Sequence, residues 1–279
     1  MAVAQDNAWG VFLSGTGEWV SVGNNYNARG YDLTSGGFTL GVDYKLTPHL
    51  AIGLAAVIPG PRPISRIAAV SGSNGGKIGL YATTFAGGWY ADTAVFGGYN
   101  SYDTRRSALQ GEARAGADGG ELNALFGTGY DFHTRSGFTF GPTATFNYTY
   151  VGLNGFSEQG SLAPLNVHGG KGESVRTAFG IKASYEWKIR GILIKPELRA
   201  AWQHEYGDGA YALDANFGSG AGNSFRVDGP PLGRDSALLG AGFAIQLSER
   251  TSTYLYYDGE LGRRNYESTN VTGGLRVAF

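Results

Sequence analysis

Val271-Thr-Gly-Gly-Leu-Arg-Val-Ala-Phe279 ends the chain and shows the pattern that decides its fold. Val271, Leu275, Val277 and Phe279 share one parity, whereas the alternate positions hold polar or small residues. A period of two is typical of a β-strand with one apolar face. The same pattern recurs through nearly all of the 279 residues, which favours a barrel whose apolar face meets lipid.

The composition is compatible with this interpretation. Charged residues make up only 16% and the net charge is -1, so nothing indicates a nucleic-acid partner. The mean hydropathy of -0.18 resembles that of a soluble protein, but alternation hides a lipid-facing surface inside such an average. No residue is cysteine, which excludes disulfides and thiolate metal sites. Residues 1–6 show no basic or apolar export signal.

The alternation predicts an all-β fold, a transmembrane antiparallel β-barrel of about twelve strands. In residues 174–187, for example, Val175, Phe179 and Ile181 alternate with Arg176 and Lys182. The expected strands are 8–20, 36–46, 49–58, 76–86, 88–102, 121–132, 138–150, 174–187, 192–206, 236–248, 250–260 and 267–279.

The links between the expected strands alternate in length. Short turns are expected at Thr47-Pro48, 86–88, 134–137, Arg190-Gly191 and Ser248-Glu249. Longer links are expected near 21–35, 59–75, 103–118, 154–171, 207–234 and 261–266. Because outer-membrane barrels have short periplasmic turns and longer extracellular loops, both termini are expected on the periplasmic side. We expect one domain, residues 1–279.

Aromatic residues near the strand ends fit interfacial girdles, and glycine is frequent on the inward parity. A soluble β-sandwich or propeller is the alternative fold, but it rarely combines inner charges with outer aromatic residues. The girdle positions are Trp9, Trp19, Tyr44, Trp89, Tyr99, Trp187, Trp202 and Tyr206.

The C-terminal third resembles the translocator (β) domain of classical autotransporters, the type V secretion proteins. The resemblance is carried by Pro196-Glu-Leu-Arg-Ala-Ala-Trp-Gln-His-Glu-Tyr-Gly-Asp208, Phe225-Arg-Val-Asp-Gly-Pro-Pro-Leu-Gly-Arg-Asp235, Tyr256-Tyr-Asp-Gly-Glu-Leu-Gly262 and the terminal strand. It implies a barrel whose lumen is crossed by a helix joined to an N-terminal passenger. The expected partners are outer-membrane lipids, the β-barrel assembly machinery, and the protein's own passenger and linker helix. Since the sequence begins almost at the first strand, we expect the passenger and most or all of the linker helix to be absent. The resemblance also suggests a monomer in the bacterial outer membrane.

The inward parity carries charges of both signs, which would either be hydrated or pair across a pore. These side chains are the candidates for lining the pore and contacting the linker helix, although a solvated barrel interior would explain any one of them. Arg199, Glu205 and Arg276 are favoured because they lie in the family-like strands. The candidates are Glu18, Asp43, Arg176, Lys182, Glu186, Glu197, Arg199, Glu205, Asp258, Glu260 and Arg276.

The terminal strand has its own hypothesis. The resemblance implies that Val271, Leu275, Val277 and Phe279 form a signal for the assembly machinery, and an unpaired end strand offers backbone groups for β-augmentation. Phe279 as a further girdle residue is the equally weighted alternative.

Two other functions stay open: a free-standing porin and, less favoured, a lipolytic barrel. A porin usually has 16 to 18 strands. A lipolytic barrel needs a Ser-His pair on the outer face with a third residue that orients the base. His204 has that parity, although it fits an interfacial girdle better. We expect no catalytic residue, cofactor or metal site, because no motif for one is visible.

Overall fold

The computed structural model describes residues 8–24, 30–60, 64–65, 70–209, 212–218 and 222–279, and every element in these ranges is a β-strand. Among these residues, no helix is long and apolar enough to cross a membrane. The strands are β1 (Trp9–Val22), β2 (Tyr31–Thr47), β3 (Leu50–Pro59), β4 (Ile64–Ser65), β5 (Val70–Ala86), β6 (Trp89–Ala108), β7 (Gly111–Tyr130), β8 (Phe132–His133), β9 (Phe138–Leu153), β10 (Phe156–Ser157), β11 (Leu165–Val167), β12 (Gly170–Tyr185), β13 (Trp187–Ile189), β14 (Ile192–Glu205), β15 (Ala212–Phe217), β16 (Phe225–Asp228), β17 (Asp235–Gln246), β18 (Thr251–Arg263) and β19 (Tyr266–Ala278).

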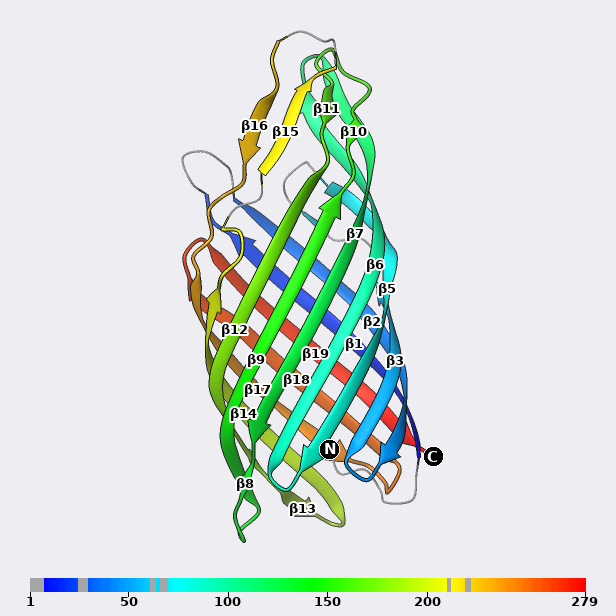
Figure 1. Cartoon of the computed structure of the whole chain (residues 1–279), viewed down its shortest axis with the longest axis vertical. Helices are drawn as coiled ribbons and strands as arrows, with labels where there is room; N and C mark the ends of the chain where they lie inside the picture. The colour runs from blue at the N-terminus through cyan, green and yellow to red at the C-terminus, as the bar shows by residue number, and fades with distance from the viewer. Residues whose placement is uncertain (1–7, 25–29, 61–63, 66–69, 210–211, 219–221) are drawn as a thin grey trace.

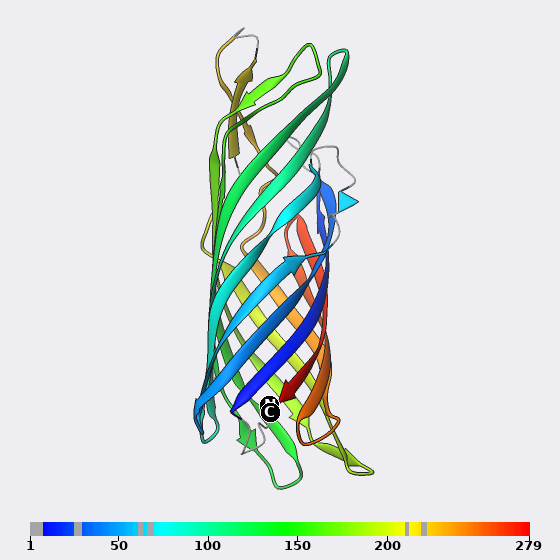
Figure 2. The same cartoon turned by 90° about the vertical axis from the view of Figure 1, so that its right-hand side faces the viewer.

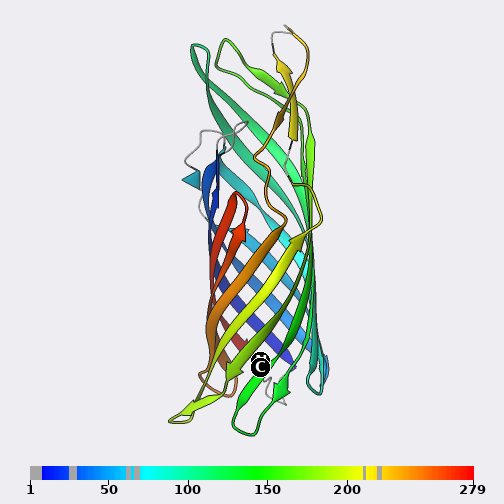
Figure 3. The same ribbon diagram turned by 90° about the vertical axis from the view of Figure 1, so that its left-hand side faces the viewer.

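Twelve long strands form a closed antiparallel barrel (Figure 1). Their order is β1-β19-β18-β17-β14-β12-β9-β7-β6-β5-β3-β2, and β1 pairs with both β19 and β2, which closes the ring. The predicted fold class and number of strands are confirmed. Two views from opposite sides, each turned by 90° from Figure 1, show the long tilted wall and the first and last strands lying side by side (Figures 2 and 3).

The two faces of the wall have opposite chemistry. Large apolar side chains on one parity are exposed, for example Leu80 at 64%, Ile181 at 67% and Leu198 at 66%. The buried side chains instead include Asp43, Glu205 and other polar groups, and none of the described large side chains is fully buried. A soluble protein rarely exposes so much contiguous apolar surface, whereas a membrane barrel requires it.

Side-chain hydrogen bonds between strands that are not neighbours identify the inner face of the barrel. Arg276 on β19 bonds Asp43 on β2 across β1, and Arg199 on β14 bonds Asp258 on β18 across β17. Side chains from non-adjacent strands converge only on the concave side of a curved sheet. The charged parity therefore faces the lumen and the apolar parity faces outward.

The turns at one end are short, as predicted. Arg190 and Gly191 connect β13 to β14 with φ angles of 50° and 86°. Two successive positive φ angles match the type I′ turn, whose twist suits a two-residue hairpin. Gly87 and Gly137 also have positive φ angles in their turns. Trp9 and Phe279 exchange backbone hydrogen bonds of 2.9 and 3.1 Å at this same end, so the first and last strands meet there.

The other end departs from the predicted loops. Residues 103–118 were expected to form a long loop, but β6 and β7 remain paired as far as Ala108 and Gly111 (Figure 1). The link expected at 261–266 is a two-residue turn between Arg263 and Tyr266. The expected links 154–171 and 207–234 contain a second sheet of order β10-β11-β15-β16, which the alternation did not predict. The long-loop end is therefore more ordered than expected.

The predicted girdle residues all lie exposed on the wall. Trp9 and Trp89 begin their strands at the short-turn end, whereas Trp202 and Tyr206 lie at the long-loop end of β14. Aromatic side chains at both ends of an apolar band are typical of the two interfaces of a membrane.

Candidate functional site: the polar lumen

A three-residue cluster crosses the closure of the barrel. Arg276 donates from Nη1 to Asp43 Oδ2 at 2.6 Å and from Nη2 to Asp43 Oδ1 at 2.5 Å. The Tyr81 hydroxyl on β5 donates to Asp43 Oδ2 at 2.8 Å. Gly10 and Gly53 lie on the intervening strands, where a Cβ would overlap the Arg276 guanidinium and the Tyr81 ring respectively. These two glycines therefore allow a single cluster to connect strands that are not neighbours.

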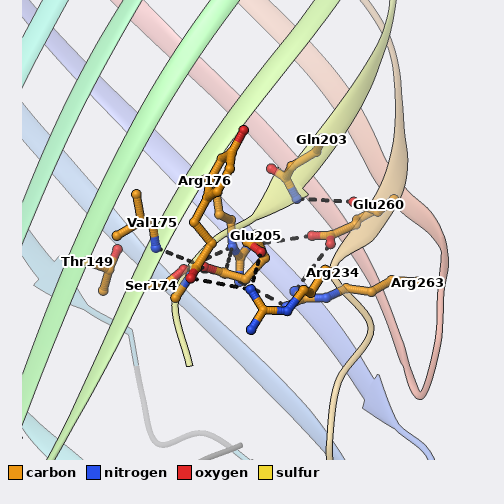
Figure 4. A network of polar contacts seen from close by, with 12 residues as sticks. Thr149, Ser174, Val175, Arg176, Gln203, Glu205, Arg234, Glu260 and Arg263 are labelled. Carbon is orange, nitrogen blue, oxygen red and sulfur yellow. Dashed lines mark hydrogen bonds and ion pairs between the residues drawn. The ribbon is translucent and has the colours of Figure 1, made fainter. Parts of the chain in front are cut away.

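A second network surrounds Glu205 at the long-loop end (Figure 4). The Glu205 carboxylate accepts bonds from the Ser174 hydroxyl at 2.6 Å and from Arg176 Nε at 2.8 Å. Arg176 also lies 3.6 Å from Glu260 Oε2, and Arg263 lies 3.4 Å from Glu260 Oε1. The side chains of Glu205 and Arg263 are only 3% and 2% exposed. Burial is tolerated because each side chain faces an opposite charge, and because Glu205 accepts several hydrogen bonds while Arg263 donates to carboxylate and carbonyl oxygens.

The Glu205 network also holds the base of the long segment after β14. The backbone N–H of Gly207 donates to the Glu205 carboxylate, and Arg263 Nε donates to the Gly233 carbonyl at 2.6 Å. Arg234 donates to the backbone carbonyl of Glu205 at 3.2 Å. This segment carries β15 and β16 of the second sheet. The lumen wall and the sheet at the mouth therefore share one set of polar contacts.

All of the sequence-predicted pore-lining residues except Glu186 lie within strands and on the face that carries the ion pairs. Glu186 follows the last residue of β12, is exposed, and donates its N–H to the Gly137 carbonyl at the short-turn end. Lys182 lies 3.1 Å from Asp131 Oδ1 and 3.9 Å from the centre of the Tyr90 ring. The others are Glu18 on β1, Asp43 on β2, Arg176 on β12, Glu197, Arg199 and Glu205 on β14, Asp258 and Glu260 on β18, and Arg276 on β19.

Sequence reasoning did not single out several partners. Lys77 and Glu121 form a 3.0 Å ion pair, and both lie on the inward parity of expected strands, so the pattern contained that signal. Arg263 has no such signal, because the register of β18 shifts between Glu260 and Arg263. A β-bulge reverses the parity that follows it.

The residues of the proposed assembly signal lie together on the outer face of β19. Leu275, Val277 and Phe279 are 44%, 37% and 58% exposed, and Val271 is half-buried on the same parity. They face outward on the strand that pairs with β1.

His204 has an acidic neighbour but no serine. His204 Nδ1 lies 2.8 Å from Asp235 Oδ1, and Thr177 is its register partner on β12. The Thr177 hydroxyl bonds Tyr206 at 3.4 Å, and within the described ranges no serine bonds His204. This arrangement does not supply the hydrogen-bonded nucleophile and base of a hydrolase. The twelve strands also fall short of the roughly 16 to 18 of a porin.

Comparison with solved structures supports a translocator fold. The translocator domain of autotransporter NalP from Neisseria meningitidis has a TM-score of 0.74 at 12% identity, covering 99% of this chain and 90% of that chain. The beta domain of the Bordetella autotransporter BrkA has a TM-score of 0.71 at 17% identity, covering 98% and 100%. The transport unit of AIDA-I from Escherichia coli has a TM-score of 0.62 at 16% identity, covering 100% and 93%.

Two curated relatives match along nearly the whole chain. An extracellular serine protease of Serratia marcescens is 27% identical over 282 residues, which cover 99% of this chain and 26% of the relative. Esterase EstA of Pseudomonas aeruginosa is 27% identical over 284 residues, which cover 97% of this chain and 43% of the relative. The chain therefore spans about a quarter to less than half the length of these relatives. The profile of the autotransporter beta-domain matches residues 11–258. The chain belongs to the autotransporter beta-domain family, and it is a translocator barrel of the bacterial outer membrane.

Proposed function

We propose that this barrel anchors an N-terminal passenger that is part of the same polypeptide, and that it takes part in moving the passenger to the cell surface. The position of β1 supports this most directly. Because β1 begins at Trp9 on the short-turn side, a segment preceding the barrel starts at the periplasmic end of a polar lumen. Passage through that lumen is the direct route to the opposite side of the membrane.

The lumen charges differ in their freedom to contact such a segment. Arg199 and Arg276 are held by Asp258 and Asp43. Glu18 and Glu197 make no ion pair within the described part of the chain. We therefore propose these two glutamates as the strongest candidates for contacts with a linker helix, in preference to Arg199, Glu205 and Arg276. The partly hydrated wall would let a polypeptide slide with little desolvation.

The remaining partners follow from the same proposal. Before β1 closes the ring, the unpaired edge of β19 would present backbone groups to the β-barrel assembly machinery, with the apolar side chains up to Phe279 on its outer face. The barrel itself would act as a monomer in outer-membrane lipid and would carry no turnover. Any enzymatic activity would belong to the passenger.

A reporter fusion tests the export function. An epitope-tagged passenger, joined through its linker ahead of β1, is expected to become accessible to protease on intact cells. The matched control is the same fusion lacking Phe279, which should lower the amount of folded barrel. A folded, heat-modifiable barrel whose reporter stays shielded in intact cells would contradict the proposal. If the barrel conducts ions equally with and without a segment fused ahead of β1, and the reporter also stays shielded, a free-standing channel would instead be favoured.

A further inference from the structure

The outer faces of β12, β14 and β17 carry an unusual combination of polar and apolar groups near the extracellular end. Their residues align in four rows across the three strands. From the extracellular side inward, the rows are Thr177–His204–Asp235, Phe179–Trp202–Ala237, Ile181–Ala200–Leu239 and Ala183–Leu198–Ala241.

The upper rows form a fixed aromatic platform. The His204 ring lies 5.8 Å from the Trp202 ring and 4.6 Å from the Tyr206 ring. Asp235 Oδ1 accepts from Trp202 Nε1 at 3.1 Å and contacts His204 Nδ1 at 2.8 Å. The Asp235 carboxylate therefore orients the Trp202 and His204 rings, which girdle residues do not require. Asp235 Oδ2 bonds no other described residue, and the Asp235 side chain is 62% exposed.

The lower rows form an apolar groove directly below the platform. A cavity of about 460 Å³ lies here, within the range of roughly 300–1,000 Å³ found for ligand sites. Its small residues are Ala183, Ala200 and Ala241, and they are flanked by the exposed side chains of Ile181 and Leu198. Alanines between larger neighbours leave a depression on the lipid-facing surface.

The spacing of the two parts fits a membrane lipid. Ala200 and His204 are four residues apart on β14, which corresponds to roughly 13 Å along the strand. The groove therefore lies at the depth of acyl chains when the platform lies at the interface. Both parts are continuous with the wall that contacts the membrane. An acylated molecule with a polar head at the outer leaflet would occupy both at once.

We propose that this surface is a specific site for one acylated glycolipid of the outer leaflet. The acyl chain lies along the Ala183, Ala200 and Ala241 depression. A sugar ring packs on Trp202 and Tyr206, and a sugar hydroxyl donates to Asp235 Oδ2. A carboxylate accepts hydroxyl hydrogen bonds but repels phosphate, so Asp235 favours a pose in which a sugar hydroxyl faces Oδ2 and the phosphates of the glycolipid lie away from it.

Lipid retention by the purified barrel tests the site. The barrel is mixed in detergent with equal amounts of short-chain lipopolysaccharide, phosphatidylglycerol and phosphatidylethanolamine, washed, and weighed by native mass spectrometry. The wild type is expected to retain one lipopolysaccharide per barrel. Ala200→Leu fills the groove and should lower retention about tenfold. Asp235→Asn weakens one acceptor and should lower it by about threefold to tenfold, as expected for one hydrogen bond.

The control is Ala56→Leu on β3. This strand lies six strands from β14 in either direction round the barrel, so enlarging its outward side chain should leave lipid retention unchanged. Heat-modifiable migration verifies folding, and Ala241→Leu fills the same groove if Ala200→Leu fails to fold. Equal retention of the three lipids, no retention by the wild type, or unchanged retention in a folded groove variant would each overturn the proposal.

Discussion

The cluster of Asp43, Arg276 and Tyr81 predicts a strong and specific loss of stability when one partner is removed. In Arg276→Ala, the Asp43 carboxylate, whose side chain is 4% exposed, keeps the Tyr81 hydroxyl but loses two charge-assisted bonds. Such bonds contribute about 1.5–3 kcal/mol each, and water from the lumen replaces part of that. We expect the free energy of unfolding to fall by about 2–4 kcal/mol, in line with other broken buried pairs.

A double-mutant cycle isolates the pair from the rest of the cluster. The variants are Arg276→Ala, Asp43→Ala and the double substitution, and each is unfolded by urea from lipid vesicles while tryptophan emission and electrophoretic mobility are followed. Because the two residues contact each other, the double variant should lose about 2 kcal/mol less than the sum of the single variants.

Lys195→Ala is the matched control. Lys195 is also a lumen cation, and it makes no ion pair within the described ranges, so its removal should change the free energy of unfolding by less than about 0.5 kcal/mol. A coupling energy below about 0.5 kcal/mol would refute the reasoning. It would show that lumen water solvates the two charges as well as they solvate each other.

Three further predictions concern other parts of the chain. Gly240→Ala places a Cβ against the ion pair that crosses β17, so the free energy of unfolding in the same urea assay should fall by about 1–3 kcal/mol. At the mouth, burial raises the pKa of Glu158, but hydrogen bonds from Arg106 and the backbone outweigh this and hold the pKa below its ordinary value of 4.5. The contribution of Glu158 to stability is therefore present above that pH and is lost as the pH falls below it. The protection factors of the β10 and β11 amides, which correct for the intrinsic exchange rate, should fall there, and Glu158→Gln should remove this dependence. Deleting Phe279 removes two backbone bonds with Trp9 and should slow barrel closure, measured as the rate at which the heat-modifiable form appears during refolding.

The sequence predicts the barrel well wherever the two faces of a strand meet different solvents. Between lipid and lumen, the alternation in 174–187 identifies β12 to within a few residues. The pattern fails in 103–118, because both faces of the β6–β7 hairpin lie beyond the apolar band and need no contrast. The second sheet was not predicted because its strands are short and pair residues of two loops that are distant in sequence.

The site was less predictable than the wall. Parity places Asp43 and Arg276 on one face, but their contact joins positions 233 residues apart and depends on how the ring closes. The preference for Arg199, Glu205 and Arg276 as pore-contact residues rested on their strands alone. In the structure, each of them is held by an acidic or basic partner, which only three-dimensional curvature could reveal.

Glycine on the lumen face resolves a conflict between hydration and rigidity. A wide polar lumen favours mobile, hydrated charged side chains, whereas a rigid barrel wall requires charged side chains that are held in place. Gly10 lets Arg276 lie flat against the wall on its way to Asp43, and Gly240 does the same for the ion pair of its neighbours. The paired charges thereby become part of the wall and leave the centre of the lumen open. Among the lumen charges that make no ion pair within the described residues, Glu18 and Glu197 provide acceptors for a basic group on a segment that passes through the lumen, whereas Lys195 would favour an acidic one.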